Sequence, residues 1–265
     1  MADDFGWQLR HRDLFGDDVD AYDAGRPGYP AKVFELLADR CGLDTRTRVL
    51  EVGPGTGQAT AQLLARGAHV TAVELNPQMA GRLKAKHPNV DVIVAPFETA
   101  DIGDEPFDLV VAATSFHWIT PAVAYRRAAD ALQEGGWLVV WWNVFGDPHH
   151  ADSFHLALVE LLKAHAPELI DPGTLPYGLD TAARIADFET SGRFGPVERH
   201  VLRWTGRHSA GELRTFFASQ SPWLALEPAR RAWLLDEVAR LAAAEFGGVV
   251  ERPYLTAVYL AKLTP

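Results

Sequence analysis

The stretch that decides the fold is V-L-E-V-G-P-G-T-G, which runs from Val49 to Gly57. A short apolar strand leads into three glycines at alternate positions, and the pattern predicts a helix directly after them, over residues 58–66. Glycine permits the positive φ of a tight turn and lets backbone N–H groups approach a ligand with no Cβ in the way. A helix N-terminus behind the turn adds a partial positive charge. We therefore predict a nucleotide-like cofactor site at this strand–helix junction.

The spacing of the glycines differs from that of the dinucleotide fingerprint. The third glycine of G-x-G-x-x-G would fall on Gln58, which makes a nicotinamide-dependent dehydrogenase the disfavoured alternative. A second predicted strand ends on Glu74, and a carboxylate at the tip of that strand can accept hydrogen bonds from both hydroxyls of a ribose. The pattern that is present is E-x-G-x-G-x-G, with Glu51, Gly53, Gly55 and Gly57.

Bulk composition narrows the classes of function. The 265 residues are 48% hydrophobic and carry a net charge of −10, with no run of Lys or Arg, so we expect no nucleic-acid partner. The single cysteine, Cys41, cannot form an internal disulfide and fits a reducing compartment. The N-terminus lacks the layout of a signal peptide, and the longest apolar runs are too short to span a bilayer. We therefore expect a cytoplasmic protein without a membrane partner.

Strands and helices alternate through the first part of the chain. Apolar strands are predicted over 48–52, 69–74, 90–95, 107–113 and 137–143, and helices over 31–41, 58–66, 77–86 and 121–132. Nearly continuous apolar strands indicate a parallel sheet that is covered on both faces. Ligands of such sheets bind beyond the carboxyl ends of the strands, which is where Gly53, Glu74, Pro96 and Thr114 fall.

The alternation of strands and helices ends after residue 145. Residues 1–29 are predicted to form an N-terminal cap segment, 30–145 a cofactor-binding core, and 194–204 and 253–263 strands that complete the sheet. Helices are predicted over 209–219, where Ser209 and Glu212 form a capping box, and over 229–246. Segments 146–193 and 205–250 are then helical insertions over the cofactor face, on the acceptor side, and not a second domain.

Two segments hold candidates for chemistry. His117 lies in T-S-F-H-W-I, residues 114–119, and its imidazole is a candidate to take a proton from an acceptor hydroxyl. The alternative is a hydrogen bond that fixes the loop, and no base is required if the acceptor is already a carboxylate. Tyr22 and Arg26 lie in Y-x-x-G-R-P-x-Y-P, where Arg26 offers a planar fork for a carboxylate, unless it is a solvent-facing arginine. The histidines of 149–155 lack the spacing of a metal site, and no metal is expected.

Three motifs together resemble class I S-adenosylmethionine-dependent methyltransferases of type 11, and within them the trans-aconitate methyltransferases. The motifs are Y-x-x-G-R-P-x-Y-P, V-L-E-V-G-P-G-T-G and S-F-H-W-I, and the resemblance covers about residues 18–145. It implies a Rossmann-like, doubly wound α/β fold. The seven-stranded sheet should have the order 3-2-1-4-5-7-6, with its last strand antiparallel.

The resemblance also implies the cofactor and its contacts. The enzyme would use S-adenosyl-L-methionine, release S-adenosyl-L-homocysteine, and methylate a carboxylate or hydroxyl of a small molecule by in-line transfer. A non-catalytic sensor or scaffold that binds the same cofactor is the alternative. Tyr22, Arg26 and Trp118 are expected at the substrate or at the cofactor carboxylate. Phe97 either contacts the adenine or is ordinary packing, and relatives usually have a small residue there. The implied cofactor-binding residues are Glu51, Gly53, Gly55, Thr56, Gly57, Glu74, Leu75, Pro96, Phe97, Glu98 and Thr114.

Overall fold

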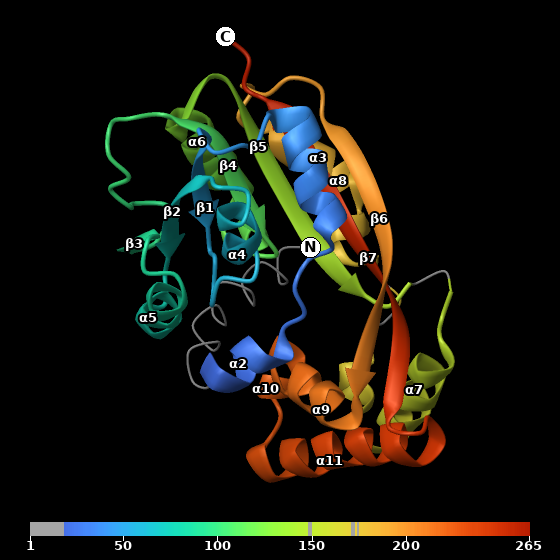
Figure 1. Cartoon of the computed structure of the whole chain (residues 1–265). Coiled ribbons are helices and arrows are strands. Elements are labelled where there is room, and N and C mark those ends of the chain that lie inside the picture. Colours follow the sequence, from blue (N-terminus) through green and yellow to red (C-terminus); the bar gives the residue numbers. More distant parts are fainter. Residues whose placement is uncertain (1–18, 148–149, 171–172, 174) are drawn as a thin grey trace.

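The protein is built around one seven-stranded sheet. The computed structural model describes residues 19–147, 150–170, 173 and 175–265, so residues 1–18 of the expected cap segment and His149 lie outside the described part. The strand order is β3-β2-β1-β4-β5-β7-β6, and β7 runs antiparallel to both of its neighbours, which confirms the predicted fold (Figure 1). The strands are β1 (Arg48–Val52), β2 (His69–Glu74), β3 (Asp91–Val94), β4 (Phe107–Ala113), β5 (Leu132–Phe145), β6 (Glu198–Ser209) and β7 (Val249–Lys262).

Helices cover both faces of the sheet and its lower end in Figure 1. The α-helices are α2 (Val19–Gly25), α3 (Ala31–Cys41), α4 (Thr60–Leu64), α5 (Pro77–Lys86), α6 (Pro121–Ala131), α7 (Ser153–His165), α8 (Thr181–Glu189), α9 (Ala210–Ala218), α10 (Ser221–Leu224) and α11 (Pro228–Glu245). Short 3₁₀ turns are η2 (Phe116–Trp118), η3 (Pro167–Leu169) and η4 (Tyr177–Leu179). No described helix combines the length and the apolar character that crossing a bilayer requires.

The alternation of side chains along β1 separates two cores. Leu50 and Val52 pack with α6 and α8 on one face, whereas Val49 packs with α3, α4 and α5 on the other. A third apolar cluster joins α7, α9 and α11 beyond the carboxyl ends of the parallel strands. Strands β6 and β7 form a long antiparallel pair that extends towards these helices, and α9, α10 and α11 connect the two strands (Figure 1).

Several boundaries differ from those expected from the sequence. Strand β6 covers 198–209 where 194–204 was expected, and β7 begins at Val249 where 253 was expected, because the antiparallel pairing of the two strands continues as far as Ser209 and Val249. Phe194 forms only an isolated bridge with Leu263. Strand β5 is longer than 137–143, and α4 is shorter than 58–66 because turns occupy 55–59.

One insertion does not lie wholly over the cofactor face. Helix α8, from the segment 146–193, packs on the sheet face beside α6, with the rings of Phe188 and Tyr125 at a centroid distance of 4.8 Å. The apolar side of α8 packs against α6 on this sheet face. The third apolar cluster is formed by α7, α9 and α11 instead. The capping box of α9 is confirmed, with Ser209 as N-cap and Glu212 returning the hydrogen bond.

Candidate active site

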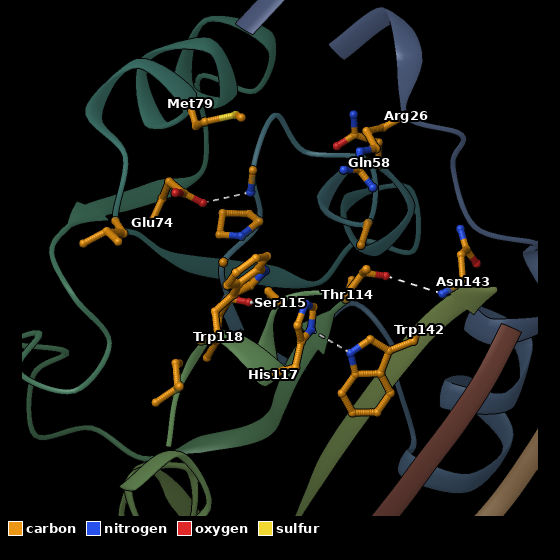
Figure 2. Close-up of a pocket in the computed structure, with 18 of the residues that line it drawn as sticks. Arg26, Gln58, Glu74, Met79, Thr114, Ser115, His117, Trp118, Trp142 and Asn143 are labelled. Carbon is orange, nitrogen blue, oxygen red and sulfur yellow. Dashed lines mark hydrogen bonds between the residues drawn. The ribbon is translucent and has the colours of Figure 1, made fainter. Parts of the chain in front are cut away.

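A cavity of about 490 Å³ opens at the carboxyl ends of the parallel strands. Its volume is in the range of small-molecule and cofactor sites. One part of its wall comes from residues that follow β1, β2, β3 and β4, as the sequence predicts. The rest comes from β5, from the segment 22–29, and from the insertions. Figure 2 shows how the labelled residues of the wall face one another across the cavity.

The glycine loop after β1 needs glycine for conformation and for packing. Gly53, Gly55 and Gly57 have φ of 64°, 60° and 97°. A Cβ on Gly53 would lie 2.6 Å from Cβ of Ser115, and one on Gly57 would lie 2.7 Å from Cδ1 of Leu83. A Cβ on Gly55 would face the Tyr22 ring at 3.6 Å, so this position borders the cavity.

The amides of this loop bind the protein itself, which differs from the expectation that they approach a ligand. Gly53 N donates to Val73 O at 2.9 Å, and Gly57 N donates to Pro54 O at 3.1 Å. Gly55 N donates to Glu74 Oε2 at 2.9 Å. The absence of side chains at the three glycines therefore lets neighbouring residues pack close to the loop, and the hydrogen bonds of the amides hold the loop in shape.

Glu74 ties the loop to the tip of β2. Its Oε1 accepts a hydrogen bond from Asn76 N at 2.9 Å, in addition to the bond from Gly55 to Oε2 (Figure 2). Burial raises the pKa of Glu74, and the backbone hydrogen bonds oppose that rise. Each carboxylate oxygen has a second lone pair, so the side chain retains the capacity to accept hydrogen bonds from the cavity that it lines.

Three of the expected cofactor residues lie outside the cavity wall, namely Glu51, Thr56 and Gly57. The alternation of β1 turns Glu51 away from the cavity, towards α4, where its Oε2 accepts a hydrogen bond from Thr60 Oγ1 at 2.6 Å. Burial, with a contribution from the charge of Glu74, raises the pKa of Glu51 to about 7. Thr56 is completely buried under the loop. These residues support the loop and do not reach the cavity.

Thr114 has an unusual backbone at the end of β4. Its φ of 59° is the only positive value among the described non-glycine residues. This region is costly for a β-branched residue and persists only where the surroundings hold it. Thr114 N donates to Trp141 O at 2.7 Å, and Tyr29 Oη donates to Thr114 Oγ1 at 3.1 Å. The constraint turns the chain sharply at the cavity wall.

His117 is fixed by an indole. Trp142 Nε1 donates to His117 Nδ1 at 3.0 Å (Figure 2), and the ring centroid of His117 lies 4.8 Å from that of Trp118. Removal from water and, after it, the positive charges of Arg184 and Arg26 lower the pKa of His117 to about 3. The imidazole is therefore neutral with its Nδ1 lone pair occupied, which differs from the expected proton acceptor and matches the loop-fixing alternative.

Helix α2 closes the cavity from the N-terminal side. A Cβ on Gly25 would lie 2.4 Å from Thr215 O, so α2 sits directly against α9. Arg26 Nη2 donates to Ser219 O at 2.7 Å, and its guanidinium lies 5.0 Å from the centroid of the Tyr22 ring. Arg26 therefore lines the cavity and is not a solvent-facing side chain.

The other expected residues divide between wall and core. Leu75, Pro96, Glu98 and Trp118 line the cavity. Phe97 also borders it, but its ring is buried and packs against Phe116 at a centroid distance of 6.4 Å, as in the packing alternative. Within the described residues, no group of three His, Cys, Asp or Glu side chains has the arrangement of a metal site.

Several wall residues were not expected from the sequence. Asn143 was recognisable, because it is a polar residue near the end of an apolar strand, like Glu74. Trp142 is hidden in an apolar run that reads as core. The positions of Tyr177 and Gln220 depend on how the insertions fold, and no local sequence pattern predicts that fold. The wall residues that sequence reasoning missed include Gln58, Asn76, Met79, Ser115, Trp142, Asn143, Tyr177 and Gln220.

Comparisons with known proteins agree with this geometry. A family model described as a methyltransferase domain, Methyltransf_11, matches residues 50–140. An uncharacterized methyltransferase of Mycobacterium tuberculosis is 30% identical over 229 residues, which cover 86% of this chain and 85% of the relative. An uncharacterized methyltransferase-like protein of Schizosaccharomyces pombe is 34% identical over 134 residues, which cover 50% of this chain and 52% of that protein.

Solved structures share the fold at lower identity. A protein of Anaeromyxobacter dehalogenans, proposed to be a type II methyltransferase, is 20% identical with a TM-score of 0.60, over 90% of this chain and 96% of that one. Phosphoethanolamine N-methyltransferase 2 of Haemonchus contortus, solved with phosphomonomethylethanolamine and S-adenosylhomocysteine, is 14% identical with a TM-score of 0.57. That match covers 98% of this chain and 60% of the other.

Proposed function

The chain belongs to the type 11 class I S-adenosylmethionine-dependent methyltransferases, and from this premise we propose that it methylates an oxygen, a carboxylate or a hydroxyl, of a small molecule. The cavity at the strand ends has a volume of about 490 Å³, within the range of sites that bind small molecules and cofactors. The observation that carries the proposal is the distribution of charge along its wall, described below.

The residues present fit the cofactor. Glu74 offers buried carboxylate oxygens at the tip of β2, where the ribose hydroxyls would bind. The missing Cβ of Gly55 leaves open space below Tyr22, and Pro96 and Glu98 border the place for the adenine. When bound, the cofactor would supply a methyl group to the acceptor oxygen, with the carbon–oxygen bond formed as the carbon–sulfur bond breaks and its electron pair stays on sulfur. A hydroxyl acceptor would also release its proton to solvent.

The two carboxylates of the wall lie at the cofactor end. Glu74 and Glu98 follow β2 and β3, whereas the part of the wall that we assign to the acceptor has the rings of His117, Trp142 and Tyr177. Arg26 lies beside Gln58 near the glycine loop, with its guanidinium 5.0 Å from the centroid of the Tyr22 ring (Figure 2). No carboxylate of the described residues lines the acceptor end. A cationic amine would therefore lack a counter-charge there, while an oxygen anion or a hydroxyl would meet hydrogen-bond donors.

The chain's own contribution is alignment and exclusion of water. Helix α2, with Tyr22, covers the loop of Gly55, and Trp118 and Trp142 form an apolar wall near His117. Methyl transfer from a sulfonium depends mainly on holding nucleophile and methyl carbon in line, which a closed, rigid wall favours.

The test is incubation with S-adenosylmethionine labelled in its methyl group and a cell extract, followed by mass analysis of the labelled species. We expect label in a small molecule, as an O-methyl group, and none with the Gly55→Val variant. Label in RNA or protein, or an N-methyl product, would contradict the proposal. Binding of the cofactor with no labelled product from any extract would favour the sensor alternative.

A further inference from the structure

Gln220 lies between α9 and α10 and borders the cavity with a side-chain amide that is not satisfied by the protein. Its Nε2 is buried and makes no hydrogen bond with any described residue. Resting on the S-adenosylmethionine-dependent methyl transfer proposed above, we propose that this amide donates a hydrogen bond to the carboxylate at the amino-acid end of the cofactor. The insertion 205–250 is then part of the cofactor site as well as of the acceptor side.

The unpaired amide of Gln220 has no structural task that explains it. Most buried polar side-chain atoms are hydrogen-bonded, and a buried donor left unpaired destabilises the fold. The side chain does not cap α10, because that helix begins without a side-chain capping bond. The main chain is fixed independently, with Gln220 N donating to Phe217 O at 3.1 Å and Gln220 O accepting from Trp223 N at 3.0 Å. Rotation about the last side-chain torsion, which is soft in glutamine, turns the N–H groups towards an occupant of the cavity.

Two other side-chain amides of the wall are already engaged with the protein. Gln58 Nε2 donates to Thr56 Oγ1 at 2.9 Å, within the glycine loop. Asn143 Nδ2 donates to Gly28 O at 3.1 Å, which ties the end of β5 to the segment before α3. Both amides therefore hold parts of the chain together. Of these three amides, Gln220 is the one whose N–H groups are left for a ligand.

The fold places Gln220 at the amino-acid end of the cofactor. Arg26 Nη2 donates to O of Ser219, the residue before Gln220, at 2.7 Å, and α2 lies beside α9 and α10 (Figure 1). Arg26 in turn lies with Gln58 and apart from Glu74 (Figure 2). A cofactor that binds Glu74 with its ribose and lies with its adenine towards β3 extends its other end along the glycine loop to this side.

The charges on this side suit a carboxylate. The guanidinium of Arg26 presents a planar set of donors with a positive charge, and Gln220 adds a neutral donor beside it. Asp23, three residues before Arg26, does not line the cavity, and its carboxylate pairs with Lys86 Nζ at 2.8 Å. The carboxylate of the cofactor therefore meets a cation and an amide donor on this side of the described wall.

The experiment compares two ligands that differ at the amino-acid end. S-adenosylhomocysteine has the carboxylate, whereas 5′-methylthioadenosine keeps the nucleoside and the sulfur but lacks it. Calorimetry measures both ligands with the unaltered protein, with Gln220→Leu, and with Gln78→Leu, which makes the same change at an exposed position of α5 outside the cavity. We expect Gln220→Leu to weaken S-adenosylhomocysteine roughly 10- to 100-fold and 5′-methylthioadenosine less than about twofold. Gln78→Leu should bind both ligands like the unaltered protein.

The outcomes separate this contact from the proposed function. Equal weakening of both ligands in Gln220→Leu would overturn the contact, because Gln220 would then shape the cavity as a whole. Unchanged affinity for S-adenosylhomocysteine would overturn it as well, and a raised KM for the acceptor in the same variant would assign Gln220 to the acceptor instead. Failure of both ligands to bind the unaltered protein would contradict the proposed function itself.

Hydrogen exchange of the unaltered protein gives a second measurement that needs no variant. A carboxylate held by Gln220 ties the link between α9 and α10 to the cofactor, so backbone amides of residues 213–224 should exchange more slowly with saturating S-adenosylhomocysteine than with saturating 5′-methylthioadenosine. Equal exchange with the two ligands would overturn the proposal.

Discussion

The indole nitrogen of Trp142 and Nδ1 of His117 are joined by a 3.0 Å hydrogen bond that links the end of β5 to the turn after β4. The two residues belong to different segments of the chain, and neither shows the pairing in its local sequence. The bond determines which imidazole nitrogen carries the proton. It therefore sets what His117 can do at the cavity.

This relationship predicts a non-titrating histidine. With the pKa of His117 lowered to about 3, the imidazole nitrogens should keep the shifts of a neutral Nε2–H tautomer from about pH 5 to 8. Nitrogen NMR on protein labelled in histidine measures this directly. In Trp142→Phe, which loses the indole donor, the tautomer should become mixed. A His117 signal that titrates near pH 6.5 in the unaltered protein would contradict the assignment.

Glu74 should control cofactor affinity through the loop as well as by direct contact. Glu74→Gln leaves one of two backbone amides, Gly55 N or Asn76 N, facing an amide group that donates. We expect the affinity for S-adenosylhomocysteine to fall by roughly 1–3 kcal/mol, measured by calorimetry. Asp91→Asn, an equal change in charge at the start of β3, is the matched control and should have no effect. Unchanged affinity in Glu74→Gln would show that Glu74 does not hold the ribose.

Glu51 should make stability fall as the pH rises. The pKa of this buried carboxyl is about 7 in the folded protein against a usual 4.5, so the folded state holds a proton that the unfolded chain releases. Its stabilising contribution is complete below about pH 4.5 and is lost as the pH passes about 7. Glu51→Gln should therefore gain up to about 3 kcal/mol in unfolding free energy, relative to the unaltered protein, between pH 5 and 8.

Urea unfolding at both pH values measures this difference. Glu134→Gln, an exposed carboxylate on β5, removes the same charge without burial and serves as the control. A stability difference for Glu51→Gln that is the same at pH 5 and pH 8 would show that the buried carboxyl is ionised throughout.

The seating of α2 on α9 should set how well the cavity closes. Gly25→Ala places a methyl group against Thr215 O, where a Cβ would be 2.4 Å away, so α2 must lift. Overpacking of this kind costs about 1–3 kcal/mol, which should appear as faster release of the cofactor in stopped-flow experiments. Gly28→Ala is the control, because a Cβ there meets nothing within 4 Å. Equal release rates in both variants would show that α2 does not need this contact.

The sequence predicts the frame of the site better than its acceptor wall. The bounds of β1, β2 and β4 match the expectation, because each strand is an apolar run that ends at a glycine turn or at polar residues. Glu74 was identified by its place at the end of a strand, a rule that depends on the parallel sheet alone. The orientation of Glu51 was also readable, since period two places it opposite Leu50 and Val52.

The acceptor wall depends on contacts between distant segments. Tyr177 reaches the cavity from η4, which packs on the sheet face that α6 and α8 cover. Gln220 reaches it from the chain between α9 and α10, whose position depends on the packing of α7, α9 and α11. The state of His117 depends on Trp142 and Arg184, which are remote in the chain. Local periodicity contains no information on such pairings. The shift of β6 from its expected bounds has the same origin.

The most direct test of the central claim is calorimetric titration of S-adenosylmethionine into the unaltered protein and into Gly55→Val. Valine at a φ of 60° would both strain the loop and fill the space that faces Tyr22. We predict one site per chain in the unaltered protein, competition by S-adenosylhomocysteine but not by NAD, and no measurable binding in the variant while its thermal unfolding stays cooperative. Equal affinity in both proteins, or displacement by NAD, would contradict the assignment of the cavity.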